Sequence, residues 1–176
     1  MSIREATTAR TWQDDVYRLL REAGITQFAY VPDAGHRAFI DAAHADPDVH
    51  AIPLSTEEEG VGVIAGAYLG GEQAVLLMQS SGVGNTINFL SLIQHCRIPF
   101  LTLVSMRGDF GEQNPWQFPM GQAVEPVLQA MGVLTLRADS PAEAVQTVEA
   151  ALSMVNRSGR AVAVLLTQRL LGVKKF

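Results

Sequence analysis

The sequence predicts an α/β fold, a doubly wound and mainly parallel six-stranded sheet with helices on both faces. Three observations lead to this prediction. Strand-like and helix-like segments alternate along the 176 residues, as parallel sheets require because each crossover needs a long connection. The last predicted strand, residues 161–166, is a nearly continuous apolar run, as a strand covered on both faces is. Hydrophobic residues make up 48% of the chain and charged residues 18%, which is the composition of one packed domain spanning residues 1–176.

The first two thirds of the chain alternate regularly. Residues 8–21 carry apolar side chains at helical spacing and predict a first helix, with Thr7 or Thr8 as its cap and Gly24 as its stop. The segments predicted after it are strand 27–31, helix 36–45, strand 49–54, helix 57–69, strand 74–78, helix 85–95 and strand 100–104. Uninterrupted alternation predicts that neighbouring strands are parallel.

The last third contains one long irregular connection and a clear helix start. The elements predicted there are the irregular stretch 107–119, helix 122–131, strand 133–136, a helix ending near residue 156, and strand 161–166. Ser140, Pro141 and Glu143 begin the long helix with a capping serine, a proline in the first turn and a carboxylate three residues after the cap. Long irregular loops in compact domains are often functional, so the stretch 107–119 is a candidate part of the site.

Charge and hydropathy exclude several kinds of partner. The net charge is -5, and the local lysine run is the terminal pair Lys174-Lys175, which is expected to be a solvated tail. Without a basic stripe the chain is not expected to bind nucleic acid. Residues 1–10 are polar, and no apolar run approaches the roughly 20 residues that span a bilayer. A soluble, cytoplasmic protein that does not bind membranes is expected.

Cysteine and histidine give no sign of a metal site. The single cysteine, Cys96, excludes an internal disulfide and a thiolate cluster, and its apolar surroundings predict a small buried residue. The histidines lack ligand spacing, so each is interpreted as a surface or core residue. They are His36, His44, His50 and His95.

The connections that follow four predicted strands are the places to look for a ligand. In an open parallel sheet, ligands bind beyond the carboxyl ends of the strands. These connections are residues 32–35, 55–59, 79–85 and 105–108. Each carries polar or charged side chains, and together they define one candidate edge of the sheet.

Three consecutive glutamates, 57–59, open the third predicted helix. Carboxylates in a first turn are stabilised by exposed amide groups and the helix dipole, so simple capping is one interpretation. Behind them Gly60, Gly62 and Gly66 leave one side of the helix nearly bare, which predicts a close approach by a strand, another subunit or a ligand. A dinucleotide fingerprint is rejected because these glycines lie inside the helix and the carboxylates would repel a pyrophosphate.

Residues 80–85 and Arg107 are ambiguous when taken alone. The first segment is either a glycine turn that needs positive φ or a set of amides that hold an anion or a polar ring edge. It lacks the lysine of a nucleotide-binding P-loop, and no serine lies in a G-x-S-x-G nucleophile elbow. Arg107 is expected to meet an anionic group or to form a surface salt bridge.

Taken together, these segments resemble the pyrimidine-binding domain of thiamine diphosphate enzymes. Within that group the chain is similar to the small, alpha subunit of the sulfopyruvate decarboxylase and phosphonopyruvate decarboxylase family. The resemblance spans nearly the whole chain. Its motifs are Val31-Pro32-Asp33, Thr56 to Gly62 followed by Ala65 to Leu69, Met78 to Asn85, Arg97-Ile98-Pro99, Arg107-Gly108, and Pro119-Met120-Gly121.

The resemblance implies roles for particular residues. One glutamate of this family hydrogen-bonds the pyrimidine ring of the cofactor, and the motif order places it at Glu57, with Glu58 as the alternative. Asp33 is implied as a proton relay. The implied cofactor contacts are Pro32, Glu57, Gln79, Ser81, Gly82 and Asn85, and the implied substrate contacts are Gln79, Ser80 and Arg107. Trp116 and Phe118 either close the pocket or contact another subunit.

The resemblance also implies a partner chain. The family needs a second domain that holds the diphosphate through Mg²⁺ with a Gly-Asp-Gly motif, and this sequence has no such motif. A beta subunit carrying that domain is therefore expected, in a hetero-oligomer with at least two copies of each chain. The run Glu112-Gln113-Asn114-Pro115 favours sulfopyruvate as substrate. The alternatives are phosphonopyruvate, another 2-oxo acid, or a non-catalytic module with the same fold that binds a partner.

Overall fold

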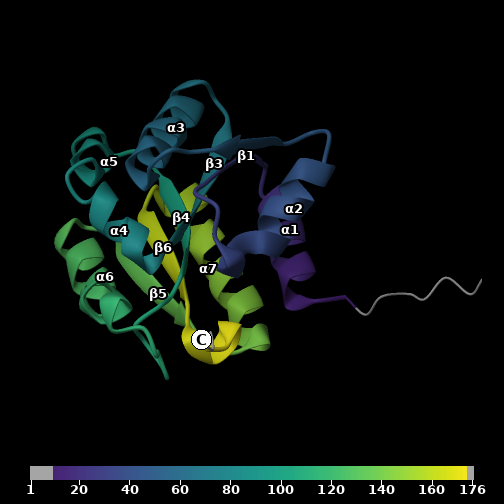
Figure 1. Ribbon diagram of the computed structural model, residues 1–176. Coiled ribbons are helices and arrows are strands. Elements are labelled where there is room, and N and C mark those ends of the chain that lie inside the picture. Colours follow the sequence, from purple (N-terminus) through teal and green to yellow (C-terminus); the bar gives the residue numbers. More distant parts are fainter. Residues whose placement is uncertain (1–9, 174–176) are drawn as a thin grey trace, which may run out of the picture.

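One sheet of six parallel strands runs through the computed structural model, which describes residues 10–173 (Figure 1). The strands are β1 Ile25–Tyr30, β2 His50–Pro53, β3 Gln73–Gln79, β4 Phe100–Ser105, β5 Leu134–Ala138 and β6 Ala161–Leu166. Their spatial order is β2-β1-β3-β4-β6-β5, and every neighbouring pair is parallel. The predicted α/β class is confirmed, and the sheet is entirely parallel.

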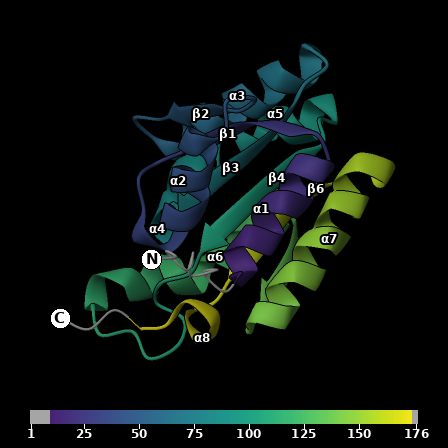
Figure 2. The same ribbon diagram turned by 90° about the vertical axis from the view of Figure 1, so that its right-hand side faces the viewer.

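Helices cover both faces of the sheet (Figures 1 and 2). They are α1 Trp12–Glu22, α2 Arg37–Ala45, α3 Glu57–Leu69, α4 Ser80–Thr86, α5 Leu90–Cys96, α6 Phe118–Ala130, α7 Pro141–Ser158 and α8 Gln168–Leu171, with 3-10 turns η1 Ala34–His36 and η2 Pro115–Gln117. The first, second and seventh helices share one apolar core with the sheet, and the third to sixth share the other. Within residues 10–173, none of the helices has the length and hydrophobicity needed to cross a membrane.

The continuous apolar runs of the strands follow from this double cover. In β3, Leu76 and Met78 pack with α3 to α6, whereas Val75 and Leu77 pack with α1, α2 and α7. Successive side chains of a strand point to opposite faces, so both sets must be apolar. Full burial of each such side chain contributes about 1.5–3 kcal/mol, which makes the central strands a rigid base for the loops at their ends.

The helix ends agree with the sequence in one case and differ in another. Ser140 caps α7 and accepts a hydrogen bond from the Glu143 amide, as predicted. Helix α1 is capped by Thr11 in a reciprocal capping box with Asp14, so it begins at Trp12 rather than at residue 8. The predicted caps Thr7 and Thr8, and the tail Lys174-Lys175, lie outside the described residues.

The segment after β3 was predicted as a loop, and that prediction is wrong. Residues 80–86 form helix α4, and the predicted helix 85–95 is instead divided between α4 and α5. Neither Gly82 nor Gly84 has a positive φ. A Cβ at Gly82 would collide with the side chain of Glu57, and one at Gly84 would lie 3.0 Å from the Met120 sulfur. These glycines therefore permit close packing of helices and do not form a turn.

Three other local predictions also need correction. Helix α6 begins at Phe118, four residues earlier than predicted, because Pro119 is tolerated in its first turn. The short helix α8 after β6 was not predicted, since four residues carry no periodicity. Cys96 is exposed at the end of α5 rather than buried, because the apolar side of that helix is formed by Leu90 and Ile93.

Candidate active site

The carboxyl ends of β1, β3 and β4 meet at the point where the strand order reverses. The chain leaves β1 toward the edge strand β2, and it leaves β3 in the opposite direction toward β4. This divergence leaves a crevice, which is where open parallel sheets bind ligands. A cavity of about 650 Å³ lies there. Asp33, Gln79, Ser105 and Arg107 line it, together with Trp12 of α1 and Leu170 of α8.

Asp33 is held rigidly in this cavity. Its carboxylate accepts hydrogen bonds from the Ser105 hydroxyl (2.6 Å), the Gln79 side-chain amide (3.0 Å) and the Gly35 amide (3.0 Å). Burial raises the pKa of Asp33, but these hydrogen bonds outweigh it and hold the pKa below its usual range. Gly35 allows this arrangement, because a Cβ there would lie 2.6 Å from the Ser105 Cβ.

His36 anchors the loop that carries Asp33 to strand β3. It is fully buried, and its Nε2 donates a hydrogen bond to the Met78 carbonyl at 3.0 Å. Burial lowers the pKa of His36, which keeps the ring neutral. Its Nδ1 has no partner within residues 10–173. Of the two interpretations of this histidine, the structure supports a core residue.

Glu57 lies at the start of α3, at the carboxyl end of β2. Its residue is 8% exposed, whereas Glu58 and Glu59 are open to solvent. The Asn85 side-chain amide donates to Glu57 Oε2 at 2.8 Å, which brings the two predicted connections together. Glu59 accepts a hydrogen bond from the Ser55 amide at 2.8 Å and so holds the connection that leads into the helix. No side chain caps the start of α3, so capping does not explain why Glu57 is buried.

The three glycines on the bare side of α3 have different surroundings. A Cβ at Gly60 would collide with Leu76 of β3, so this glycine allows the helix to pack on the sheet. A Cβ at Gly62 would lie 3.4 Å from the Phe89 ring, and one at Gly66 would meet nothing within 4 Å. Close packing on a strand thus explains the first glycine, and the third faces open space.

The serines of α4 play unequal parts. Ser80 is fully buried, and its hydroxyl accepts from the Arg107 amide at 3.0 Å, which ties the end of β3 to the end of β4. Ser81 is exposed and donates to Gln79 Oε1 at 2.9 Å. The Gln79 amide is therefore oriented from both sides, by Ser81 and by Asp33. Gln79 connects the helix that packs on Glu57 with the cavity that contains Asp33.

Arg107 forms a buried ion pair that the sequence did not reveal. Its Nε and Nη2 donate to the two oxygens of Glu112 at 2.6 and 2.8 Å, and the side chains are 15% and 0% exposed. The Glu112 carboxylate also accepts from the amides of Gly108, Gln113 and Asn114 and from the side chain of Gln168. These contacts, the Arg107 guanidinium foremost, hold the pKa of Glu112 well below its usual range.

Gln168 is a structural residue of the site that sequence reasoning missed. Its side chain donates to Glu112 at 3.0 Å and accepts from the amides of Asp109 and Phe110 at 2.9 and 3.0 Å. Arg169 beside it stacks on the Phe110 ring, 3.9 Å from its centre. Gln168 follows the last strand at the same sheet edge, so the rule applied to four other strand ends would have found it.

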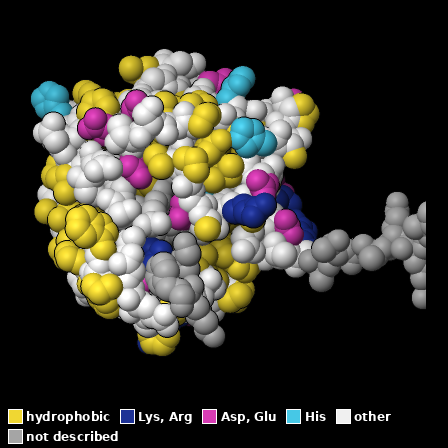
Figure 3. Space-filling view, viewed as in Figure 1, with side chains coloured by type: hydrophobic (Ala, Val, Ile, Leu, Met, Phe, Trp, Pro, Cys, Tyr) yellow, Lys and Arg dark blue, Asp and Glu magenta, His cyan; other side chains and the backbone are white. Residues whose placement is uncertain are grey.

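Trp116 and Phe118 do not line the cavity. Trp116 is 83% exposed and Phe118 is 42% exposed, on the loop and first turn that lead into α6. Figure 3 shows hydrophobic side chains gathered on the left of this view, where Figure 1 places α4 and α6. Of the two interpretations of this aromatic pair, exposure supports a subunit contact.

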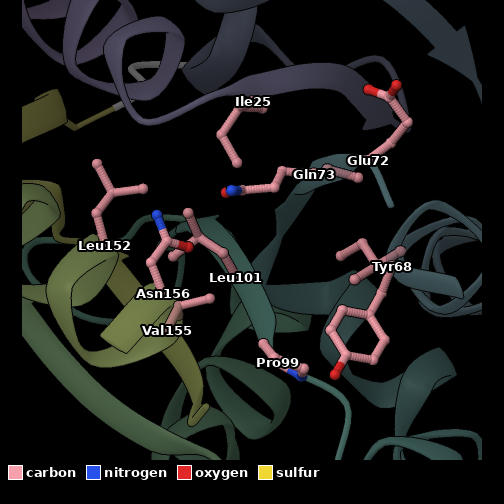
Figure 4. Close-up of a pocket in the computed structure, with 11 residues that line it drawn as sticks. Ile25, Tyr68, Glu72, Gln73, Pro99, Leu101, Leu152, Val155 and Asn156 are labelled. Carbon is pink, nitrogen blue, oxygen red and sulfur yellow. The ribbon is translucent and has the colours of Figure 1, made fainter. Parts of the chain in front are cut away.

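A second, smaller cavity lies at the opposite edge of the sheet. It measures about 160 Å³ and is bounded by Ile25, Gln73 and Pro99 at the amino ends of three strands (Figure 4). Its walls are largely apolar, and it is remote from Asp33 and Glu57. Within residues 10–173, no group of three or more His, Cys, Asp or Glu side chains is arranged to hold a metal ion.

The lowered pKa of Glu112 predicts a specific loss of stability in acid. A carboxylate with a depressed folded pKa contributes stability that is fully present above its ordinary value of 4.5 and is lost as the pH falls toward the folded pKa. As the pH is lowered from about 5 to about 3, we expect the thermal midpoint of the wild type to decrease. In Glu112→Gln the decrease should be less steep. Glu22→Gln, at an exposed pair on α1, is the control and should follow the wild type. If the thermal midpoints of Glu112→Gln and the wild type decrease equally with pH, the prediction is contradicted.

Two relatives align with almost the whole chain. The sulfopyruvate decarboxylase subunit alpha of Methanococcus maripaludis is 37% identical over 152 residues, which are 86% of this chain and 91% of that protein. The same subunit of Methanothermobacter thermautotrophicus is 39% identical over 152 residues, or 86% and 92% of the two chains. No protein-family model matches the sequence.

More distant relatives are much longer than this chain. The sulfopyruvate decarboxylase of Methanosarcina acetivorans is 34% identical over 122 residues, which are 69% of this chain and 31% of that protein. The phosphonopyruvate decarboxylase of Streptomyces viridochromogenes is 34% identical over 116 residues, or 65% and 29%.

Among solved structures, a 2-oxoglutarate:ferredoxin oxidoreductase from Magnetococcus marinus, with 2-oxoglutarate, coenzyme A and succinyl-CoA bound, has the same arrangement. Its TM-score is 0.72 at 13% identity, over 92% of this chain and 29% of that chain. At this level of identity, the likeness concerns the fold.

Proposed function

The chain belongs to the family of sulfopyruvate decarboxylase alpha subunits, and on that basis we propose that it is one half of an enzyme that removes carbon dioxide from sulfopyruvate to leave sulfoacetaldehyde. The observation that carries the proposal is the 37% identity to a subunit of this name over 91% of its length. The crevice at the sheet edge, with polar groups in fixed orientations, supports the same conclusion.

Thiamine diphosphate is the proposed cofactor, and the geometry around Glu57 fits it. Glu57 Oε2 is bonded by Asn85, while Oε1 has no partner within residues 10–173 and is not fully enclosed. A nearly buried carboxylate with one open oxygen suits a hydrogen bond to a ring nitrogen. Gly82 allows helix α4 to pack directly on this carboxyl group, because a Cβ there would collide with it. When bound, this cofactor supplies the carbanion nucleophile and electron sink that decarboxylation of a 2-oxo acid needs.

Most of the other proposed contacts line the cavity that contains Asp33, whose lining does not include Glu57. Pro32, Gln79 and Ser81 are proposed to meet the cofactor. Asp33, held ionised by its hydrogen bonds, is proposed to accept a proton near the reacting carbon rather than donate one. Arg107 is proposed to meet the acidic group of the substrate. Ser80 is proposed to act indirectly, because its buried hydroxyl is bonded to the Arg107 backbone.

A beta subunit is the proposed source of the diphosphate-binding domain and its Mg²⁺. The chain spans about nine tenths of the alpha subunits it matches, but only 31% of the longer Methanosarcina relative. A partner that supplies the remaining portion accounts for this difference. The exposed Trp116, Phe118 and Phe89, and the open space over Gly66, are suited to contact it. At least two copies of each chain are proposed.

Two alternatives have different standing. A phosphonopyruvate decarboxylase is supported by 34% identity over 116 residues, a shorter match than the alpha subunits give. A non-catalytic module that kept the fold predicts no decarboxylation with any partner. The burial of Glu57 disfavours the module, since a capping residue has no need to be enclosed.

The proposal is tested on the complex purified from the native host through a tag on this chain. Intact mass and bound thiamine diphosphate are recorded, and carbon dioxide release is then measured with sulfopyruvate. A second chain, bound cofactor and turnover together support the proposal. A chain that purifies alone, without cofactor and without turnover, would favour the non-catalytic module.

A further inference from the structure

The Arg107–Glu112 pair leaves one edge of the guanidinium for a ligand. Nε and Nη2 are bonded to Glu112, whereas Nη1 has no partner within residues 10–173 and is not fully enclosed. The small exposed part of the side chain therefore includes Nη1, and Arg107 lines the cavity that contains Asp33. A guanidinium fixed by a bidentate pair can present its remaining donors to an anion without reorganising.

Glu112 also cancels the charge of Arg107. Its side chain is fully buried, and every hydrogen bond that it makes comes from a donor, as an ionised carboxylate requires. Apart from Arg107, the one charged side chain lining this cavity within residues 10–173 is Asp33. Arg107 carries one positive charge, and Glu112 and Asp33 carry one negative charge each. This wall of the cavity, formed around these three residues, therefore has a net negative charge.

We propose that Glu112 is a specificity-determining positioning residue, which aims the Arg107 Nη1 edge at the acidic group of the substrate while its charge makes this wall favour a sulfonate over a phosphonate. The proposal rests on the proposed function. Sulfonate and phosphonate are similar in shape, but a sulfonate carries one negative charge, whereas a phosphoryl group carries close to two at neutral pH. The second charge is repelled by Glu112 and Asp33, and no other cation among residues 10–173 lines this cavity to offset the repulsion.

The size of the effect follows from the short distances in a partly buried site. One additional unit charge near two carboxylates changes affinity by roughly tenfold or more at the effective dielectric of such sites. We therefore expect sulfopyruvate and phosphonopyruvate to differ in KM more than in kcat, since Glu112 is not proposed to touch the reacting carbon.

The pH dependence of KM distinguishes recognition of the substrate's charge from recognition of its shape. The second proton of a phosphoryl group dissociates near about pH 6, so a phosphonate becomes singly charged in mild acid while a sulfonate does not change. Around the cavity, burial keeps His36 neutral, and the pKa of Asp33 and of Glu112 is lowered. The remaining charged groups nearby within residues 10–173 are paired or stacked: Asp109 with Arg137, Arg10 with Asp15, and Arg169 on Phe110.

The first test uses the wild-type complex with its partner chain. kcat and KM are measured for sulfopyruvate and for phosphonopyruvate from about pH 5.5 to about pH 8.5. We expect sulfopyruvate to be favoured about tenfold or more in kcat/KM at the alkaline end, and the ratio to narrow in acid as KM for phosphonopyruvate falls. A ratio that does not change with pH, in an enzyme that turns over sulfopyruvate, would overturn the inference and leave the proposed function intact. Failure to turn over either substrate would overturn both.

The second test removes the charge of Glu112. In Glu112→Gln, confirmed as folded by its thermal midpoint, we expect the sulfopyruvate preference at about pH 8 to shrink about tenfold, mainly through KM. Glu22→Gln removes a carboxylate from an exposed pair on α1, and its preference should equal that of the wild type. An unchanged preference in folded Glu112→Gln would overturn the inference. If that variant does not fold, the pH comparison of the wild type decides.

Discussion

Glu57→Gln is expected to lower kcat for sulfopyruvate by about 10²–10⁴-fold in the complex with its partner chain, the range that a positioned proton-transfer group contributes. The amide is almost the same size as the carboxylate and can still accept the Asn85 hydrogen bond at Oε. What it loses is the negative charge that we propose lies beside the ring nitrogen of the cofactor. Folding and assembly should therefore survive, and intact mass and the thermal midpoint verify this.

Glu58→Gln is the matched control for that experiment. Glu58 is the neighbouring residue of the same helix turn, but its side chain is exposed. Its variant should retain activity within about threefold, as a surface substitution does. Full activity in Glu57→Gln, or a larger loss in Glu58→Gln, would sink the assignment of Glu57 and make Glu58 the residue to pursue.

Gly82→Ala should impair the enzyme without removing any functional group. A Cβ at Gly82 would collide with the carboxyl group of Glu57, so either this side chain or helix α4 must shift. A displacement of about 1 Å in a catalytic group can cost on the order of 10²-fold in rate. We expect a loss of about that size in kcat, accompanied by weaker binding of thiamine diphosphate and a lower thermal midpoint.

Gly66→Ala is the control for this glycine. A Cβ at Gly66 would meet nothing within 4 Å, and the residue lies inside α3. Alanine in a helix interior is favoured over glycine by about 0.5–1 kcal/mol, so the isolated chain should be slightly more stable. If Gly82→Ala matches the wild type in rate and cofactor affinity, the close packing of α4 on Glu57 has no catalytic importance.

The sequence by itself determined the fold class. Helix α3 and strand β6 coincide with their predicted ranges, and Ser140 caps α7 as predicted. These features depend on local periodicity and on capping chemistry, both of which are visible in short windows. The rule that ligands bind at the carboxyl ends of parallel strands also directed attention to Asp33 and Gln79, which the structure places in hydrogen-bonding contact.

Other features were settled by the tertiary structure alone. Three adjacent glutamates are equivalent in sequence, but α4 packs on Glu57 and leaves Glu58 in solvent. Gly82 was expected to form a turn with positive φ or to present its amide to a ligand, whereas here it has no positive φ and permits contact between two helices. Arg107 meets Glu112 within one loop and Gln168 joins them from 56 residues away, and burial gives this network its strength. Burial and side-chain partners depend on residues brought together by folding, so no local pattern of residues encodes them.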